Sequence, residues 1–140
     1  MLKRLALSCA AAGLLAAPAL YADEPIEPVE LTKGARQLAE LLEGRVAGEP
    51  QRCIRTTPAR NIQTIDDTAL VYRQGDTLWV NYTRNARGLD EDDVLVIERF
   101  SGSRLCRTDQ ITTIDRFGGF FTGFVLLDDF VPYTIVDGEA

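Results

Sequence analysis

Short runs of strand-forming residues, each followed by a turn, succeed one another through most of this 140-residue chain and limit what it can fold into. The clearest example lies on either side of the loop at residues 74–76. In the run 77–83, Leu78, Val80 and Tyr82 alternate with the residues between them, which is the two-residue period of a strand. Because the preceding run is also rich in strand formers, the two runs predict a β-hairpin.

Similar runs continue toward both ends of the chain. Candidate strands lie at residues 52–56, 62–65, 68–73, 77–83, 94–100, 104–106, 110–117 and 120–127, with a short edge piece at 130–133, and we expect six or seven of them to form. Turn-forming residues separate them at 66–67, 101–103 and 118–119. The pattern predicts an all-β, mainly antiparallel fold, a small rolled sheet or barrel of six or seven short strands with one N-terminal amphipathic helix.

The helix is predicted from a different period. Leucines fall at i, i+3 and i+4 from Leu38, which indicates an amphipathic helix over residues 33–43. Thr32 is a suitable N-cap and Gly44 can end the helix. We expect the helix to cover one side or one end of the sheet, and a partner-binding helix is the alternative.

The first 22 residues have the pattern of a secretory signal peptide. Lys3 and Arg4 precede an apolar run over residues 5–20, and small residues allow cleavage after Ala22 or after Ala19. We therefore expect a periplasmic or secreted protein.

The remaining chain is expected to contain two further parts. Residues 23–30 are acidic and proline-containing, which predicts a flexible leader, and residues 31–136 form a single β-rich domain. Cys9 lies too early in the signal peptide for lipid attachment, so a lipoprotein is not expected. No later apolar run approaches the roughly 20 residues that a membrane-spanning helix needs.

Two cysteines, Cys53 and Cys106, remain once the signal peptide is removed. In an oxidising compartment such a pair usually forms a disulfide, and the chain-entropy model gives a bridge over a loop of this length about 4 kcal/mol of stability. A redox-active or free pair is the alternative. The wide spacing lacks the Cys-X-X-Cys pattern that lowers a thiol pKa, which favours a structural bridge.

Charge and composition exclude several classes of function. Without Lys3 and Arg4, 13 basic residues remain against 21 acidic ones, a net charge of −8. A chain this acidic repels nucleic-acid phosphates and anionic membrane surfaces. The absence of histidine excludes the usual Ser-His-Asp and Cys-His catalysis and removes the commonest ligand for zinc and copper. We therefore predict no nucleic-acid partner, no metal and no cofactor.

A set of short motifs lies in the middle of the chain. It comprises Cys53-Ile54, Ile65-Asp66-Asp67, the run 77–82, Leu89, the run 94–100, Leu105-Cys106-Arg107 and Asp109. Together these motifs resemble an exported proteobacterial domain family of unknown function, over roughly residues 50–116. Many members carry a further cysteine in the loop before Leu89, whereas residues 85–89 here contain none. The resemblance implies export and a β architecture, and it carries over no catalytic residue.

Clustered carboxylates suggest two chemistries. The loop at residues 90–93 (Asp-Glu-Asp-Asp) has oxygen ligands for Ca²⁺, but it lacks the spacing of a calcium loop, and a solvated turn is the simpler interpretation. The pairs Asp66/Asp67 and Asp128/Asp129 are candidate acid–base groups. Adjacent strand residues point to opposite faces, which favours turn and capping roles instead.

Two further aspartates lie near arginines. Asp109 follows the second cysteine closely, so we expect it to fix the local hairpin. Asp109 and Asp115 lie on or near the strand predicted at 110–117. Arg107 and Arg116 make a buried Asp–Arg pair plausible on sequence grounds, with a role in a binding site as the alternative.

The C-terminal third holds the densest aromatic region. Its members are Phe117, Phe120, Phe121, Phe124, Phe130 and Tyr133. Aromatic residues in a small domain more often fill the core, but on an exposed β face they bind sugars or peptides. Strict alternation places Phe120 and Phe124 on one face of their strand and Phe121 on the other. With Trp79, which is either ligand-facing or a lid at the core edge, the candidate binding surface is Trp79, Phe120, Phe121, Phe124 and Phe130.

The sequence thus favours an exported, non-enzymatic accessory or binding module that recognises an envelope protein or a small ligand. One alternative is a structural envelope protein that self-associates through an edge strand. A second is a hydrolase of cell-wall sugars that uses carboxylates alone, for example Asp67 with Asp109.

Overall fold

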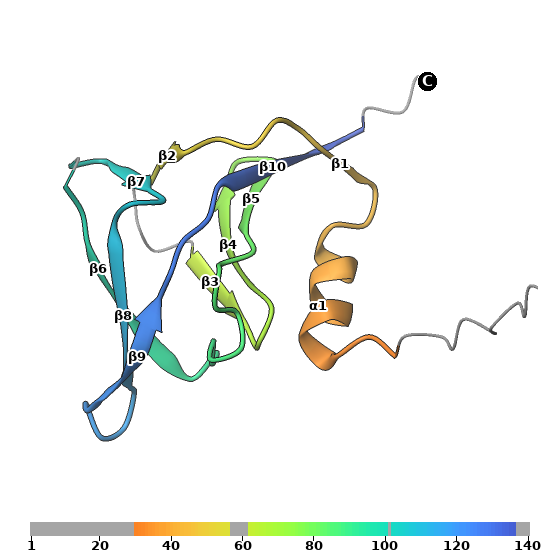
Figure 1. The fold of residues 1–140 in the computed structure, drawn as a ribbon. Helices are drawn as coiled ribbons and strands as arrows, with labels where there is room; N and C mark the ends of the chain where they lie inside the picture. Colours follow the sequence, from red (N-terminus) through yellow and green to blue (C-terminus); the bar gives the residue numbers. More distant parts are fainter. Residues whose placement is uncertain (1–29, 57–61, 101, 137–140) are drawn as a thin grey trace, which may run out of the picture.

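The fold is taken from a computed structural model that describes residues 30–56, 62–100 and 102–136 (Figure 1). Over these residues one helix, α1 (Lys33–Leu41), precedes ten strands. The strands are β1 (Arg45–Ala47), β2 (Cys53–Arg55), β3 (Ile62–Ile65), β4 (Ala69–Gln74), β5 (Thr77–Asn81), β6 (Asp93–Glu98), β7 (Arg104–Cys106), β8 (Gln110–Asp115), β9 (Phe121–Val125) and β10 (Phe130–Ile135).

The strands form three antiparallel sheets. A five-stranded sheet has the order β1-β10-β5-β4-β3, a three-stranded sheet has the order β6-β8-β9, and β2 pairs with β7. The five-stranded sheet lies between α1 on one side and the other two sheets on the opposite side (Figure 1). The structure therefore has three layers: the helix, the five-stranded sheet, and the two smaller sheets.

Each face of the five-stranded sheet carries its own apolar cluster. In β4, Ala69 and Val71 pack toward Leu38 of α1, whereas Leu70 and Tyr72 pack toward the smaller sheets. This is the two-residue alternation of a strand that is buried on both faces.

The helix is capped and docked closely. The Thr32 hydroxyl accepts a hydrogen bond from the Ala35 N–H at 3.2 Å, and Gly44, in the turn that follows, has a φ of +70°. Gly34 faces the turn between β3 and β4, where a Cβ atom would overlap the Asp66 carbonyl oxygen and the Thr68 hydroxyl. The glycine that weakens the helix locally is what allows it to approach the sheet.

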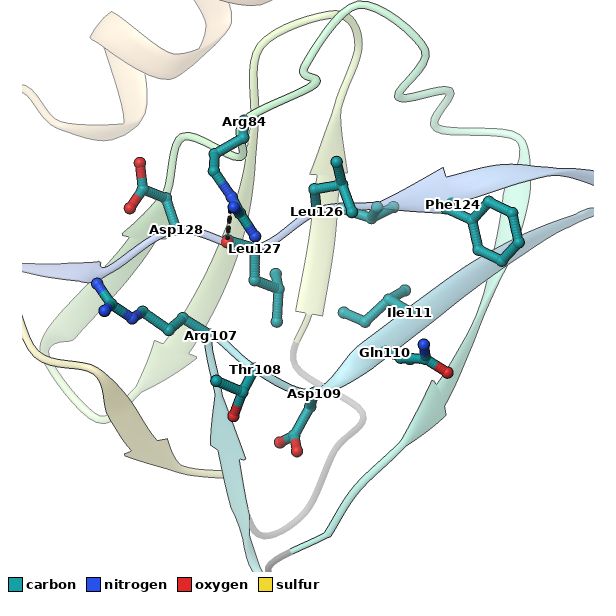
Figure 2. A pocket seen from close by; sticks show the side chains of 11 residues that line it. Arg84, Arg107, Thr108, Asp109, Gln110, Ile111, Phe124, Leu126, Leu127 and Asp128 are labelled. Atoms are coloured by element: carbon teal, nitrogen blue, oxygen red, sulfur yellow. Dashed lines mark hydrogen bonds between the residues drawn. The ribbon is translucent and has the colours of Figure 1, made fainter.

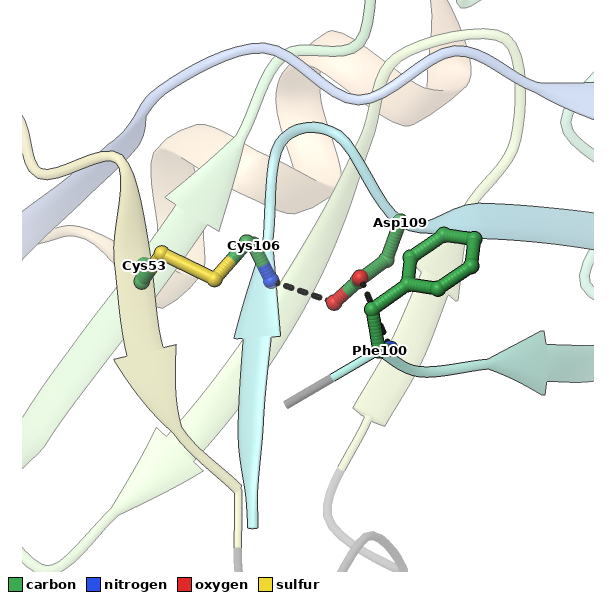
Figure 3. The surroundings of a disulfide bond; sticks show 4 residues. All are labelled: Cys53, Phe100, Cys106 and Asp109. Carbon is green, nitrogen blue, oxygen red and sulfur yellow. Dashed lines mark hydrogen bonds between the residues drawn. A yellow bond between two sulfur atoms is a disulfide. The ribbon is translucent and has the colours of Figure 1, made fainter. Parts of the chain in front are cut away.

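The two cysteines form the predicted disulfide. Cys53 and Cys106 are direct partners in the β2–β7 pair, with Cα atoms 4.0 Å apart (Figure 3). Ile54 and Leu105, the next pair in register, are both buried in the core beside the smaller sheets. The bridge joins segments 53 residues apart, and it fixes the two-stranded sheet against that core.

The predicted all-β fold with one N-terminal helix is confirmed, and the structure has more strands than the six or seven expected. β1 is an addition, because its three residues pair with β10 alone and have no clear period of their own. The expected short edge strand at 130–133 is instead β10, which lies inside the five-stranded sheet between β1 and β5. Its length and its second partner depend on contacts that are distant in sequence.

Two predictions concern parts of the chain that the structure does not describe. The signal peptide at 1–22, and all of the leader except Glu30, lie outside the described residues. Within the described residues, no helix is both long and apolar enough to cross a membrane.

Candidate functional site

The three-stranded sheet has one face toward the core and one toward solvent. On β6, Leu95 and Ile97 are half-buried against the core, whereas Val94 and Val96 alternate with them and are exposed. Cross-strand partners share a face, so the solvent side of the sheet is defined by Val94, Val96, Thr112, Ile114, Phe121 and Phe124. We call these six residues the outer face.

A bulge in β9 brings two phenylalanines onto this outer face. Phe121 is opposite Ile114 and Phe124 is opposite Thr112, so β9 has one more residue than β8 over this stretch. The extra residue is Thr122, whose hydroxyl donates to an Asp93 carboxylate oxygen at 2.6 Å and lies 2.8 Å from the Thr113 hydroxyl. These contacts turn Thr122 toward Thr113, away from the outer face, although Thr122 stays exposed. The strict alternation predicted for this strand is therefore wrong.

The two rings make direct contact and remain accessible. The ring centroids of Phe121 and Phe124 are 4.9 Å apart in an edge-on arrangement. Phe121 is 56% exposed and Phe124 is 60% exposed. Val94 and Val96 are also exposed on the same face, so the outer face is an apolar surface, and the exposed Glu98 borders it at the end of β6.

The hairpin between β8 and β9 adds further aromatic surface. Phe117 is 88% exposed and Phe120 is also largely exposed. The Asp115 carboxylate accepts hydrogen bonds from the backbone N–H groups of Phe117 and Gly118, which holds the turn. The exposed rings therefore extend beyond the strands to the tip of a hydrogen-bonded hairpin.

A groove of about 720 Å³ begins at the edge of the outer face, beside Phe124 (Figure 2). Its buried floor is formed by Ile111, Val125 and Leu127, and Leu126 lies next to Phe124 at one end. Figure 2 shows Arg84, Arg107 and Asp128 together at the other end. The groove thus has an apolar end that is continuous with the outer face and a charged end.

The charged end is partly neutralised within the protein. Arg107 forms an ion pair with Asp129 at 3.1 Å, and both side chains are about one-third exposed. Arg84 donates from Nε to the Leu127 carbonyl at 3.2 Å. These contacts orient both guanidinium groups along the groove.

Two asparagines hold the chain that lines the groove. Asn85 donates to the Phe124 carbonyl at 2.7 Å and accepts from the Leu126 N–H at 2.8 Å. The fully buried Asn81 does the same with the carbonyl and N–H of Asp128, at 2.6 and 3.0 Å. Both asparagines were missed at the sequence level, because their partners lie about 40 residues away and no local pattern identifies them.

The residues of the predicted binding surface separate in the structure. Phe120, Phe121 and Phe124 are exposed, as a binding surface requires. Phe130 is a correction: it is only 2% exposed, because it packs into the core between the sheets. Trp79 is half-buried against the same core and donates its indole N–H to Gln74, so it forms a lid at the core edge.

Asp109 has a structural position next to the disulfide. It is buried, and its carboxylate accepts hydrogen bonds from the Cys106 N–H at 2.7 Å and the Phe100 N–H at 3.3 Å (Figure 3). The predicted role in fixing the local hairpin is confirmed. The expected buried Asp–Arg pair is wrong. Arg107 pairs with Asp129, and both side chains are partly exposed, while Arg116 donates to the Asp92 carbonyl.

The other clustered carboxylates line a different part of the surface. Asp67 lies in the turn between β3 and β4 and lines a separate cavity from Asp109. Asp66 accepts from the Glu91 N–H at 2.7 Å, and Lys33 lies within 4 Å of both Asp66 and Glu91. The acidic loop is thus joined to the start of α1. In the described part of the chain, no group of three or more Cys, Asp or Glu residues is arranged to hold a metal ion.

A pair of tyrosines on the five-stranded sheet was not predicted. The hydroxyl groups of Tyr82 and Tyr133 are 2.6 Å apart. Partial burial raises the pKa of Tyr82 well above its ordinary value, and the hydrogen bond to Tyr133 raises it further. The hydrogen bond joins the residue that follows β5 to β10.

Comparison with protein-family models, curated proteins and solved structures found no match to this chain. The resemblance to an exported domain family of unknown function therefore stays a prediction.

Proposed function

We propose that the protein is an exported, non-enzymatic binding module that docks an envelope protein on its outer face. The observation that carries this proposal is the bulge at Thr122, because it gathers Phe121 and Phe124 on one exposed surface. A regular strand would direct one of these rings into the core side.

The size of the exposed surface supports a protein partner. Phe117, Phe120, Phe121 and Phe124 are each more than half exposed. Together they present on the order of 500 Å² of aromatic surface, the size of the largest apolar patch on a typical monomer, and such patches are often functional. Aromatic residues of this kind are the usual anchors of protein interfaces.

Charge favours a partner other than a second copy. The outer face is apolar and is bordered by a single exposed carboxylate on β6, that of Glu98, so its recognition is mainly apolar. The whole chain has a net charge of −6, and two copies repel each other.

Two further observations are compatible with this function. The disulfide between Cys53 and Cys106 is typical of proteins in oxidising compartments. Asp109 and Asp115 accept backbone hydrogen bonds, which supports structural roles for these carboxylates.

The test compares two variants of the tagged protein by crosslinking in cells. Phe121→Ser with Phe124→Ser removes both rings from the outer face, and Val46→Ser is the matched control at an exposed apolar residue of β1. We expect the wild type and the control to capture the same partner near stoichiometry and the double variant to lose it. Retention of that partner by a folded double variant would contradict the proposal.

A further inference from the structure

The free edges of two strands, one from the five-stranded sheet and one from the three-stranded sheet, border the same groove. β3 ends the five-stranded sheet and β6 ends the three-stranded sheet. Residues of both strands line a cavity of about 760 Å³. Among the described residues, β3 pairs with β4 only and β6 with β8 only, so the facing edges have no strand between them.

The hydrogen-bonding direction of β6 follows from its neighbour β8. The Asp115 N–H donates to the Phe120 carbonyl, on the β9 side. Backbone groups of alternate residues point to opposite edges of a strand, so Thr112 and Ile114 direct theirs toward β6. Their partners on β6 are Val96 and Val94. The backbone N–H and C=O groups of the intervening Leu95 and Ile97 therefore point into the groove.

The same residues leave the core incompletely covered. Leu95 and Ile97 of β6 and Ile62 of β3 pack against the core but remain only partly buried, and all three line the groove. The central members of that core, such as Leu105 and Ile111, are almost completely buried. A strand added to β6 would place every second side chain over these three residues and bury them.

Charge at one end of the groove indicates the chemistry of the occupant. Glu91, Asp92 and Asp93 lie there. Of the two arginines that line the groove, Arg99 and Arg116, only Arg116 reaches this end, where it donates to backbone carbonyls and leaves the carboxylates in excess. Among the described residues, the Asp92 carboxylate has no hydrogen-bond or ion-pair partner, while its backbone carbonyl accepts from Arg116. An acidic protein with an unpaired carboxylate at this position favours a cationic ligand.

We propose that this groove binds an extended segment of a partner protein, with alternating apolar residues and a basic residue at the acidic end. The segment adds as a strand to β6 through the backbone groups of Leu95 and Ile97, and β3 forms the opposite wall. Backbone hydrogen bonds supply affinity in this mode of recognition, and alternate side chains supply selectivity. The groove shares Val94 with the outer face, but neither Phe121 nor Phe124 lines it, because both lie on β9 at the opposite edge of the same sheet.

The test uses the purified protein and the peptide Lys-Val-Thr-Val-Thr-Val-Lys at about 1 mM. We expect the amide hydrogens of Leu95 and Ile97 to exchange with solvent about tenfold more slowly when the peptide is bound. The matched control is the same peptide with N-methylated valines, which keeps the side chains and removes backbone donors. It should give no slowing.

Variants test the contribution of the Asp92 charge and the independence of this groove from the outer face. Asp92→Asn should weaken peptide binding by about twofold to fivefold, the range of an exposed ion pair, whereas Asp76→Asn, an equal change of charge outside the groove, should not. The variant Phe121→Ser with Phe124→Ser should bind the peptide normally, so this inference can fail or hold independently of the proposed function. Unchanged exchange at Leu95 and Ile97, equal slowing by the methylated peptide, or slowing at other strand edges would each overturn the proposal.

Discussion

The rings of Phe121 and Phe124 meet edge-on with centroids 4.9 Å apart, although an offset of three residues places side chains on opposite faces of a regular strand. The bulge at Thr122 supplies the extra residue that reverses this relationship. The hydrogen bond from Thr122 to Asp93 holds the bulge on the side away from the outer face. The exposed aromatic surface is therefore a consequence of a polar contact beneath it.

A double-mutant cycle should detect the contact between the two rings. We expect the stability losses of Phe121→Ala and Phe124→Ala to be non-additive, with a coupling energy of about 0.5–1.5 kcal/mol in urea unfolding. Losses that add within the error of the measurement would show that the rings do not stabilise each other.

Gly34→Ala should destabilise the protein in spite of the higher helix propensity of alanine. A Cβ atom there meets the Asp66 carbonyl oxygen, so α1 must move away from the turn between β3 and β4. We expect a loss of about 1–3 kcal/mol, the usual range for overpacking. Gly88→Ala is the control, because its Cβ atom meets nothing within 4 Å, and its free energy of unfolding should change by less than about 0.5 kcal/mol. Equal effects of the two substitutions would contradict the close docking of α1.

Asp109→Asn should destabilise the hairpin beside the disulfide. An amide has only one acceptor oxygen, so one of the two N–H groups, of Cys106 or of Phe100, loses its partner. A loss of about 1–3 kcal/mol is expected from thermal or urea unfolding. Glu40→Gln on the exposed side of α1 is the control. If Asp109→Asn leaves stability unchanged, the carboxylate is not the structural group described here.

The raised pKa of Tyr82 predicts a dependence of stability on alkaline pH. Burial and the Tyr133 hydroxyl favour the protonated form in the folded state, whereas tyrosine in the unfolded chain ionises near its ordinary pKa of about 10. The contribution to stability is therefore complete below about pH 10 and is lost as the pH rises above it. Tyr133→Phe should lower the pKa of Tyr82 in a spectrophotometric titration of tyrosinate. A titration that is unaffected by this substitution would rule out the paired hydroxyl groups.

Local patterns in the sequence predicted the elements that depend on near neighbours. The Thr32 cap and the leucine period gave α1 to within two residues at its end, and the alternation around residues 77–83 identified β5. The disulfide was predictable because only two cysteines follow the signal-like segment. In each case, the feature that decides the structure is either a local pattern of a few residues or the number of cysteines.

The candidate site depended on relationships that alternation does not encode. The bulge in β9 is fixed by Thr122 and Asp93, which lie 29 residues apart in the sequence. Burial of Phe130 follows from the position of β10 inside the five-stranded sheet, and the sequence suggested an edge. Sequence reasoning therefore found the aromatic segment and could not sort its members between core and surface.

The most direct measurement places a photo-crosslinking amino acid at Thr112, at the centre of the outer face, in cells that export the protein. The matched position is Glu40 on the exposed side of α1. We expect one abundant protein adduct from Thr112, absent from Glu40 and lost when Phe121 and Phe124 are both changed to serine. Adducts that are the same from both positions, or an adduct that survives loss of both rings, would contradict the binding of a partner on the outer face.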